Sequence, residues 1–415
     1  MYERNVSWVE KLVDEQNRWR MKTINLIASE NVLSQRARAV MGSDFAHRYA
    51  EGHPGERYYQ GTDKIDEIEA RVKQHLKSLF SCRHVEVRSI SGTIANDAVI
   101  SRFVSPGDVV MVNSTSGGGH ISHHKDGSVG KYTKNIVDFP LTPDGYHTDV
   151  DKTRELIKAL RPKFLIFGKS LFLFPEPVEQ LRDICDKYGI ITLYDAAHVL
   201  GLIAGKQFQD PLSEGADMMT GSTHKTFFGS QRGLILSNMK ESMWHKIDQG
   251  AFPGSSSNHH LDTLVPLAIS TYEILEYGEK YATQVVANAK ALAEGLVRFG
   301  FEVQGKQFGF TETHQVAVDV KRQGGGDEVA RMLQDNGIIL NMNLLPFEPL
   351  KNVLNPAGIR IGTQEMTRFG MKESEMERIA ELIKVCLKDG KPVDEEVAEF
   401  RSDFTEVAYS FDADR

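Results

Sequence analysis

Residues 222–226 read Ser222-Thr223-His224-Lys225-Thr226, and they lie between two apolar runs, 190–195 and 233–238, that have the length and composition of strands. Lys225 follows a histidine and is flanked by hydroxyl residues, which is not the pattern of a helix face. Because lysine is mostly exposed in proteins, a solvated loop lysine is the commoner interpretation. Burial beside another cation lowers the pKa of a lysine, however, and the neutral amine can then attack an aldehyde. Lys225 is therefore a candidate for Schiff-base formation with a cofactor.

Further strand-like runs occur at 108–113 and 164–168, and helical patterns at 151–160 and 176–188 separate the runs from one another. Strands joined by crossover helices form a mostly parallel sheet. Ligands of such sheets bind outside the carboxyl ends of the strands. We therefore expect the residues that follow each run to face a ligand.

The remaining chain is predicted to flank this sheet. We expect helices at 6–22 and 65–80, loops over 25–62, a long helix at 262–300, strands near 315–320 and 337–341, a helix at 373–388 and an acidic tail after 389. The predicted fold is α/β, with a large, mostly parallel sheet domain and a smaller C-terminal α/β domain. The predicted division is an N-terminal arm with active-site loops (1–60), a large cofactor-binding domain (61–262), and an inter-domain helix with the small domain (263–415).

Two further stretches suit a phosphorylated pyridine ring. Asp195 ends an apolar run, and an acidic partner on the ring nitrogen makes such a ring a better electron sink. Ser91-Gly92-Thr93 opens a helical stretch, where free backbone N–H groups and the helix dipole attract an anion. Both stretches also fit ordinary helix caps, so neither is specific alone.

Residues 117–124 read Gly117-Gly118-Gly119-His120-Ile121-Ser122-His123-His124. The glycines permit close approach of the backbone to a ligand, and His120 could stack on a flat ring. The competing interpretation is a metal site built from the three histidines. We expect no metal, because no cysteine or paired carboxylate accompanies them and the spacing is not a standard zinc pattern.

Arg360 stands between apolar residues and glycines in Gly358-Ile359-Arg360-Ile361-Gly362. A planar guanidinium suits an α-carboxylate, and a structural ion pair is the alternative. In chain order the features are a phosphate loop, a stacking histidine, a strand-end aspartate, a Schiff-base lysine and a carboxylate-binding arginine. Together they predict a pyridoxal phosphate (PLP) enzyme that acts on the α-carbon of a small amino acid.

Composition excludes other classes. With 415 residues the chain is long enough to bury a core without disulfides or metals, and three separated cysteines favour a reducing compartment. The net charge of −8 argues against nucleic acid as a partner. No apolar run approaches the roughly 20 residues that span a bilayer, and no signal peptide is recognisable. We expect a cytoplasmic protein with no membrane partner.

The motifs together resemble serine hydroxymethyltransferase, a PLP-dependent family with the aspartate-aminotransferase fold. The resemblance runs from about residue 5 to 390, and the amino-acid sequence at 166–172 and 198–211 is similar to that of the archaeal-type branch. It is densest in Leu26–Asn31, Tyr49–Gly55, Arg57–Tyr59, Asp195–Gly201, Thr223–Thr226, Phe252–Gly254 and Gly358–Thr363.

The resemblance implies a role for each matching residue. Lys225 holds PLP, Asp195 pairs with the pyridinium, His120 stacks on the ring, Ser170 supports it, and His198 bonds near the ring oxygen and the substrate. The phosphate is surrounded by Ser91, Gly92, Thr93, Ser222 and His224, with Gly254 of a partner subunit. The substrate carboxylate is held by Ser29, Tyr59, His198 and Arg360.

The resemblance also implies a homodimer with shared active sites, because Tyr49, Glu51 and Tyr59 reach across the interface. Glu51 acts as acid and base near the hydroxymethyl group, with Tyr49 beside it. The implied reaction interconverts serine and glycine and passes a one-carbon unit to a reduced pterin such as tetrahydrofolate.

The chain departs from the family pattern on the acceptor side. The departures are Lys169, Gly229-Ser230-Gln231-Arg232-Gly233, Ser255-Ser256-Ser257, Thr115, Ile121 and Asn341-Met342-Asn343. They leave open a pterin-independent aldolase or transaldolase of β-hydroxy amino acids. A non-enzymatic PLP-fold binding protein is the third hypothesis, and intact Lys225, Asp195 and Arg360 speak against it.

Overall fold

A seven-stranded sheet forms the centre of the larger part of the molecule in the computed structural model, which describes residues 2–412. Its strand order is β4-β10-β9-β8-β7-β5-β6. The bounds are β4 His84–Glu86, β5 Val110–Val112, β6 Ile136–Asp138, β7 Phe164–Phe167, β8 Ile191–Asp195, β9 Met218–Ser222 and β10 Gly233–Ser237.

The pairing is parallel from β9 through β8, β7 and β5 to β6. Strand β10 lies between β4 and β9 and runs in the opposite direction to both. Strands β5, β7 and β10 are buried at every position, which is expected of a sheet covered on both faces. The covering helices are α3 Asp63–Leu79, α4 Gly92–Phe103, α5 Ser128–Tyr132, α6 Val150–Leu160, α7 Val178–Tyr188, α8 Leu200–Ala204 and α9 Glu241–Gln249. The predicted α/β fold with a large, mostly parallel sheet is confirmed.

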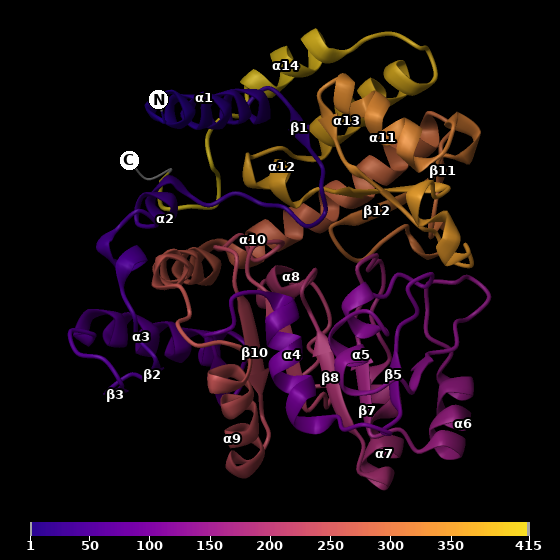
Figure 1. Ribbon diagram of the computed structural model, residues 1–415. Helices are drawn as coiled ribbons and strands as arrows, with labels where there is room; N and C mark the ends of the chain where they lie inside the picture. The colour runs from indigo at the N-terminus through magenta and orange to yellow at the C-terminus, as the bar shows by residue number, and fades with distance from the viewer. Residues whose placement is uncertain (1, 413–415) are drawn as a thin grey trace.

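A second hydrophobic core lies above the large sheet, in orange and yellow in Figure 1. Its four-stranded antiparallel sheet has the order β11-β12-β15-β14. The bounds are β11 Glu302–Val303, β12 Gln315–Asp319, β14 Asn341–Asn343 and β15 Gly358–Gly362. The helices of this part are α11 Gly326–Asp335, α12 Gln364–Arg368, α13 Glu373–Leu387 and α14 Asp394–Ser402.

Helix α10, Leu261–Arg298, joins the two parts and crosses between them in Figure 1. Its first half packs on α3 and α8, and its second half packs on α13. A helix of 38 residues spans roughly 57 Å at 1.5 Å per residue, so one rigid element supports both cores.

The N-terminal segment contributes to both parts. Helix α1, Glu3–Arg20, buries none of its side chains, whereas β1, Ile24–Asn25, pairs in parallel with β13, Ile338–Ile339. Between them and the large domain lie short elements: α2 Gln35–Ala39, β2 Gly52–His53 and β3 Glu56–Arg57. The domain boundaries at 60/61 and 262/263 stay a prediction, and their outer limits, 1 and 415, lie outside the described residues.

Two details differ from expectation. The strand expected near 337–341 is divided into two: β13 pairs with β1 and β14 pairs with β15, so the chain changes sheets at Leu340. The segment after 389, expected only as an acidic tail, contains α14, whose Val397 and Arg401 are buried. Only two buried positions, four residues apart, mark this helix in an acidic stretch, and such a short pattern does not predict a helix.

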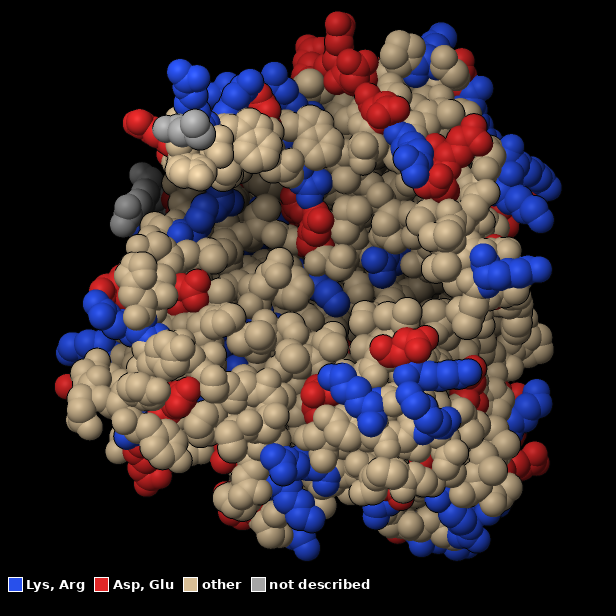
Figure 2. Space-filling view, viewed as in Figure 1, with Lys and Arg blue, Asp and Glu red and all other residues tan. Residues whose placement is uncertain are grey.

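Within residues 2–412, no helix combines the length and the apolar character that crossing a bilayer requires. On the face shown in Figure 2, lysine and arginine side chains alternate with aspartate and glutamate.

Candidate active site

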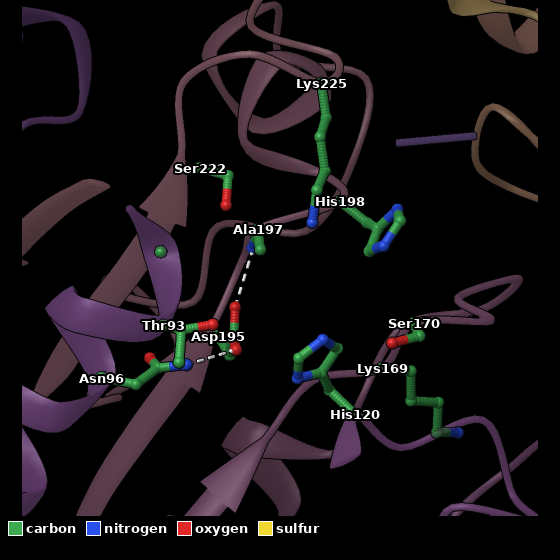
Figure 3. Close-up of a pocket in the computed structure, with 11 residues that line it drawn as sticks. Thr93, Asn96, His120, Lys169, Ser170, Asp195, Ala197, His198, Ser222 and Lys225 are labelled. Atoms are coloured by element: carbon green, nitrogen blue, oxygen red, sulfur yellow. Dashed lines mark hydrogen bonds between the residues drawn. The ribbon is translucent and has the colours of Figure 1, made fainter. Parts of the chain in front are cut away.

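A pocket with about 300 Å³ of empty space lies at the carboxyl ends of the parallel strands. It brings together residues that follow β4, β5, β7, β8 and β9, as the topology predicts. Figure 3 shows the lining residues Gly92, Thr93, Asn96, His120, Lys169, Ser170, Asp195, Ala197, His198, Ser222 and Lys225.

Lys225 extends its amine into this pocket toward Asp195 and His198 (Figure 3). Burial lowers the pKa of Lys225 to about 8, the Asp195 carboxylate opposes this shift, and the Arg360 guanidinium adds to it. A lysine with this pKa carries a substantial neutral fraction near neutrality, which a nucleophilic amine needs. The solvated loop lysine is therefore the wrong interpretation.

Asp195 ends β8 with its carboxylate in a ring of donors. Oδ2 accepts hydrogen bonds from Asn96 Nδ2 at 2.7 Å and lies 3.0 Å from His123 Nε2, and Oδ1 accepts from the Ala197 amide at 2.9 Å. Burial alone would raise the pKa of Asp195, but His123, Asn96 and the amide together hold it well below its usual range. Asp195 therefore stays ionised, as the partner of a protonated ring nitrogen must.

Helix α4 points its N-terminus at the pocket. The Ser91 side chain accepts from the Ile94 amide at 3.2 Å and caps the helix, while the amides of Gly92 and Thr93 have no acceptor within the helix by its geometry. A Cβ on Gly92 would lie 2.4 Å from Ser222 Oγ, so a larger residue at this position would have to displace the Ser222 hydroxyl. The residues Thr93 and Ser222, which line the pocket and carry hydroxyls, and the free amides of α4 thus lie where a phosphate could bind.

Arg360, in β15 of the second part, contacts Ser170 in the pocket wall but does not itself line the pocket. Its Nη1 donates to the Ser170 carbonyl at 2.7 Å, and Nε and Nη2 donate to Asn341 Oδ1 at 3.2 and 3.1 Å. Burial lowers the pKa of Arg360 to about 10. Within residues 2–412 no carboxylate forms an ion pair with this side chain, so the structural ion pair is not what holds it.

His198 connects the two parts. Its Nδ1 lies 2.9 Å from Gln315 Nε2, and its ring stacks on His314 with centroids 5.8 Å apart. Burial and the Lys225 ammonium hold the pKa of His198 well below its usual range, so the ring is neutral. A neutral ring beside the Gln315 amide donor leaves Nε2 protonated and able to donate to a ligand.

The three histidines after the glycine run have different partners. His120 Nδ1 lies 2.7 Å from Ser122 Oγ, His123 binds Asp195, and His124 Nε2 lies 3.1 Å from the Asn113 carbonyl. Burial lowers the pKa of His120 to about 4, so its ring is neutral at the pocket wall. Across the described chain, no group of three or more histidine, cysteine or acidic side chains is arranged to hold a metal.

Two predicted residues line a neighbouring cavity instead. Ser29 and His224 face this larger space, which also contacts Gln231. The buried Nδ1 of His224 has no hydrogen-bond partner among the described residues, and burial lowers its pKa to about 4.

Four predicted residues lie away from the pocket of their own chain. Tyr49 and Tyr59 are exposed, with ring centroids 5.5 Å apart, and partial burial and the Glu51 carboxylate raise the pKa of Tyr59. Gly254 is exposed in the segment Gly250–Ser255 after α9. One subunit alone does not bring these residues to Lys225.

The unusual loop after Lys225 is held by Arg232. This guanidinium is fully buried and donates to the carbonyls of Val87, His259 and His260 and to Thr263 Oγ1. Ser230 donates to the Thr263 carbonyl. Ser230 and Arg232 therefore join the loop after Lys225 to the start of α10.

Sequence reasoning missed three residues that contact the predicted ones. Asn96 could have been found, because it lies one helical turn after Gly92 and shares its face. His123 follows His120 by three residues but was considered only as a metal ligand. Gln315 carries no local signal, because only the packing of β12 on the 168–172 segment brings it to His198.

Comparison with known proteins identifies the family to which this sequence is similar. The family model of serine hydroxymethyltransferase matches residues 3–383. The chain is similar to the serine hydroxymethyltransferase of Archaeoglobus fulgidus, at 48% identity over 411 residues that cover 98% of this chain and 93% of the relative. It is also similar to that of Sulfolobus acidocaldarius, at 46% identity over 97% of this chain and 93% of the relative.

Among solved structures, the chain is similar to a crystal structure of L-threonine transaldolase from Pseudomonas fluorescens. The TM-score is 0.90 and the identity 28%, with 100% of this chain and 95% of the other covered. That enzyme has the PLP-dependent fold expected from the sequence. On its sequence and its fold, this chain belongs to the serine hydroxymethyltransferase family of PLP-dependent one-carbon transferases.

Proposed function

We propose that this protein interconverts serine and glycine and passes the one-carbon unit to a reduced pterin of the tetrahydrofolate type. One observation carries the proposal. The Lys225 amine and the ionised Asp195 carboxylate face one pocket, and Arg360, which has no carboxylate partner within residues 2–412, donates to the carbonyl of Ser170 in the wall of that pocket. The 48% identity to a serine hydroxymethyltransferase over nearly the whole chain supports the same reaction.

The donor set fits pyridoxal phosphate. Lys225 would hold the aldehyde carbon and Asp195 the ring nitrogen, while His120 would stack on the ring and Ser170 would support it. The phosphate would lie against the start of α4, with donors from Ser91, Gly92, Thr93, Ser222 and His224 and from Gly254 of a partner subunit. Bound PLP supplies an electron-withdrawing ring that stabilises negative charge at the α-carbon of an amino acid.

The roles of the protein's own residues follow from their environments. His123 and Asn96 keep Asp195 ionised. Arg360, with Ser29, Tyr59 and His198, would fix the substrate carboxylate and thereby orient the bond that breaks perpendicular to the ring. Arg360 is suited to this because its remaining N–H groups are buried and unpaired by any acid.

The proton transfers require a group that the single chain does not place in the pocket. We infer a homodimer in which Glu51 of one subunit moves protons at the hydroxymethyl group of the other, with Tyr49 and Tyr59 beside it. The Tyr49–Glu51–Tyr59 cluster supports this, because it leaves two exposed aromatic rings beside a half-buried carboxylate at the surface of one chain. We also infer a cytoplasmic location, which three free, buried cysteines support.

The reaction is tested by following serine cleavage with and without tetrahydrofolate, alongside cleavage of threonine. We expect serine cleavage to accelerate strongly when the pterin is added. Pterin-independent serine cleavage together with faster threonine cleavage would replace this proposal with an aldolase or transaldolase.

A further inference from the structure

Lys169 forms a buried ion pair in the wall of the pocket. Its Nζ lies 2.7 Å from Glu176 Oε1, and the exposed fractions of the two side chains are 2% and 0%. Nζ also donates to the Tyr146 carbonyl at 2.6 Å. In Figure 3 the Lys169 side chain runs away from Lys225 and His198. The Lys169 ammonium therefore binds groups of the protein itself and does not point toward a ligand.

Neutral donors complete the surroundings of Glu176. Its Oε2 accepts hydrogen bonds from Thr148 Oγ1 at 2.9 Å and from Asn113 Nδ2 at 3.0 Å. Asn113 Oδ1 in turn accepts from the Gly168 amide at 2.9 Å. A buried pair with this many partners is held in one geometry, because each lost contact leaves a charge uncompensated.

This network fixes the backbone next to Lys169. Gly168 has a φ of +130° and packs so closely on the Asp195 carbonyl that a Cβ would lie 2.3 Å from it. Lys169 forms a bridge with Gly119, and the Ser170 amide donates to the Gly118 carbonyl at 2.6 Å. The carbonyl of Ser170 is thereby held in one position.

Two groups from the second part of the molecule bind that carbonyl. Arg360 Nη1 donates to it at 2.7 Å and Gln315 Nε2 at 3.0 Å, and Gln315 also contacts His198. Ser170 is therefore the point where the large sheet sets the orientation of the guanidinium.

We propose that Lys169, through its ion pair with Glu176 and its hydrogen bond to Tyr146, is a positioning residue for amino-acid binding: it fixes the Ser170 carbonyl that orients Arg360. The inference rests on the proposed role of Arg360 in holding the substrate carboxylate. It assigns a function to a lysine that departs from the family pattern at this position.

The test compares Lys169→Met with the double variant Lys169→Met/Glu176→Gln. The single variant leaves a buried carboxylate unpaired and should lower the Tm of the cofactor-free protein, and the double variant should recover most of that loss. In both holoenzymes we expect the KM for serine and the Kd for glycine to rise about tenfold while kcat changes by less than about threefold, because the substrate anchor is displaced and the reacting groups are not.

Lys384→Met is the control, since Lys384 Nζ in α13 also lies 2.7 Å from a carboxylate oxygen, that of Asp389 just after the helix, away from the pocket. It should change neither constant. A folded double variant with the KM and Kd of the unmodified protein would overturn the proposal. Arg360→Lys separates failure of the proposed function from failure of this inference. If Arg360→Lys leaves the Kd for glycine unchanged, the proposed carboxylate site fails. If Arg360→Lys raises that Kd but the Lys169 variants do not, only the role of Lys169 is contradicted.

Discussion

At the residue scale, the site depends on the protonation states of three neighbouring groups. Asp195 is kept charged by donors, His198 is kept neutral by burial and the Lys225 ammonium, and Lys225 itself titrates near neutrality. Each group acquires these properties from partners that lie far away in sequence. The chemistry of the pocket is therefore set by the fold around it.

The pKa of Lys225 predicts the pH dependence of cofactor capture. The ordinary lysine pKa of 10.5 falls to about 8 in the folded chain, so the neutral amine is scarce below pH 8 and predominates above it. The rate at which cofactor-free protein combines with PLP should rise through a midpoint near pH 8 and then level off, measured by absorbance in a stopped-flow instrument. A midpoint near the ordinary lysine value would contradict this environment.

Arg360→Lys tests the carboxylate anchor. A lysine keeps the charge but cannot contact Asn341, the Ser170 carbonyl and a carboxylate together, because it lacks the planar fork. Loss of one charged hydrogen bond, worth about 1.5–3 kcal/mol, should raise the KM for serine at least about tenfold. Steady-state kinetics measure this, and an unchanged KM would place the carboxylate elsewhere.

Lys225, Asp195 and Arg360 could be predicted from the sequence because each stands in a short stretch that is odd for its residue type. A lysine among hydroxyl residues and an arginine between glycines are visible without a structure. The neighbours that tune them are not visible in this way. Gln315 looks like any polar residue in a strand, and its contact with His198 arises only when β12 packs on the 168–172 segment.

At the element scale, the site is made by the ends of strands and the start of one helix. Strands β5, β7, β8 and β10 and helices α3, α6 and α7 followed from apolar runs and helical spacing, since buried strands are strongly patterned. Strands β4, β6 and β9 were not predicted. The two-residue strand β1 could not be predicted, because two residues have no periodicity, and the strand expected near 337–341 did not show that its part β13 pairs with β1. Their pairing depends on contact between segments more than 300 residues apart.

The junction of α4 and β9 gives an element-scale prediction. Gly92→Ala places a methyl group 2.4 Å from Ser222 Oγ and should lower the free energy of unfolding of the cofactor-free protein by about 1–3 kcal/mol. Adding Ser222→Ala removes the colliding oxygen and should restore most of the loss, measured by urea denaturation. Gly42→Ala is the control, because nothing lies within 4 Å of its new Cβ. Equal effects of both glycine substitutions would show that α4 has room to move.

At the scale of the whole molecule, the two cores meet along α10, and the pocket is lined by the larger part and contacted from the smaller one. Arg360 and Gln315 belong to one side, and Lys225, Asp195 and Ser170 to the other. The site therefore requires both parts in register, and we propose that it also requires a second subunit.

Subunit mixing tests the shared site. Lys225→Ala and Glu51→Gln should each be nearly inactive alone. If the subunits are unfolded, mixed in equal amounts and refolded, half of the dimers are hybrids with one intact site, so activity should recover to about a quarter of the unmodified protein. No recovery from a mixture shown to be dimeric by sedimentation would contradict an active site shared between subunits.

The most direct test of the account is to reduce the PLP-loaded protein with borohydride and locate the modified lysine by peptide mass mapping. Lys169 is the natural comparison, because it is the other lysine that lines the pocket. We predict that the pyridoxyl group is attached to Lys225 alone. Attachment to Lys169, or to a surface lysine, would contradict the assignment of the site.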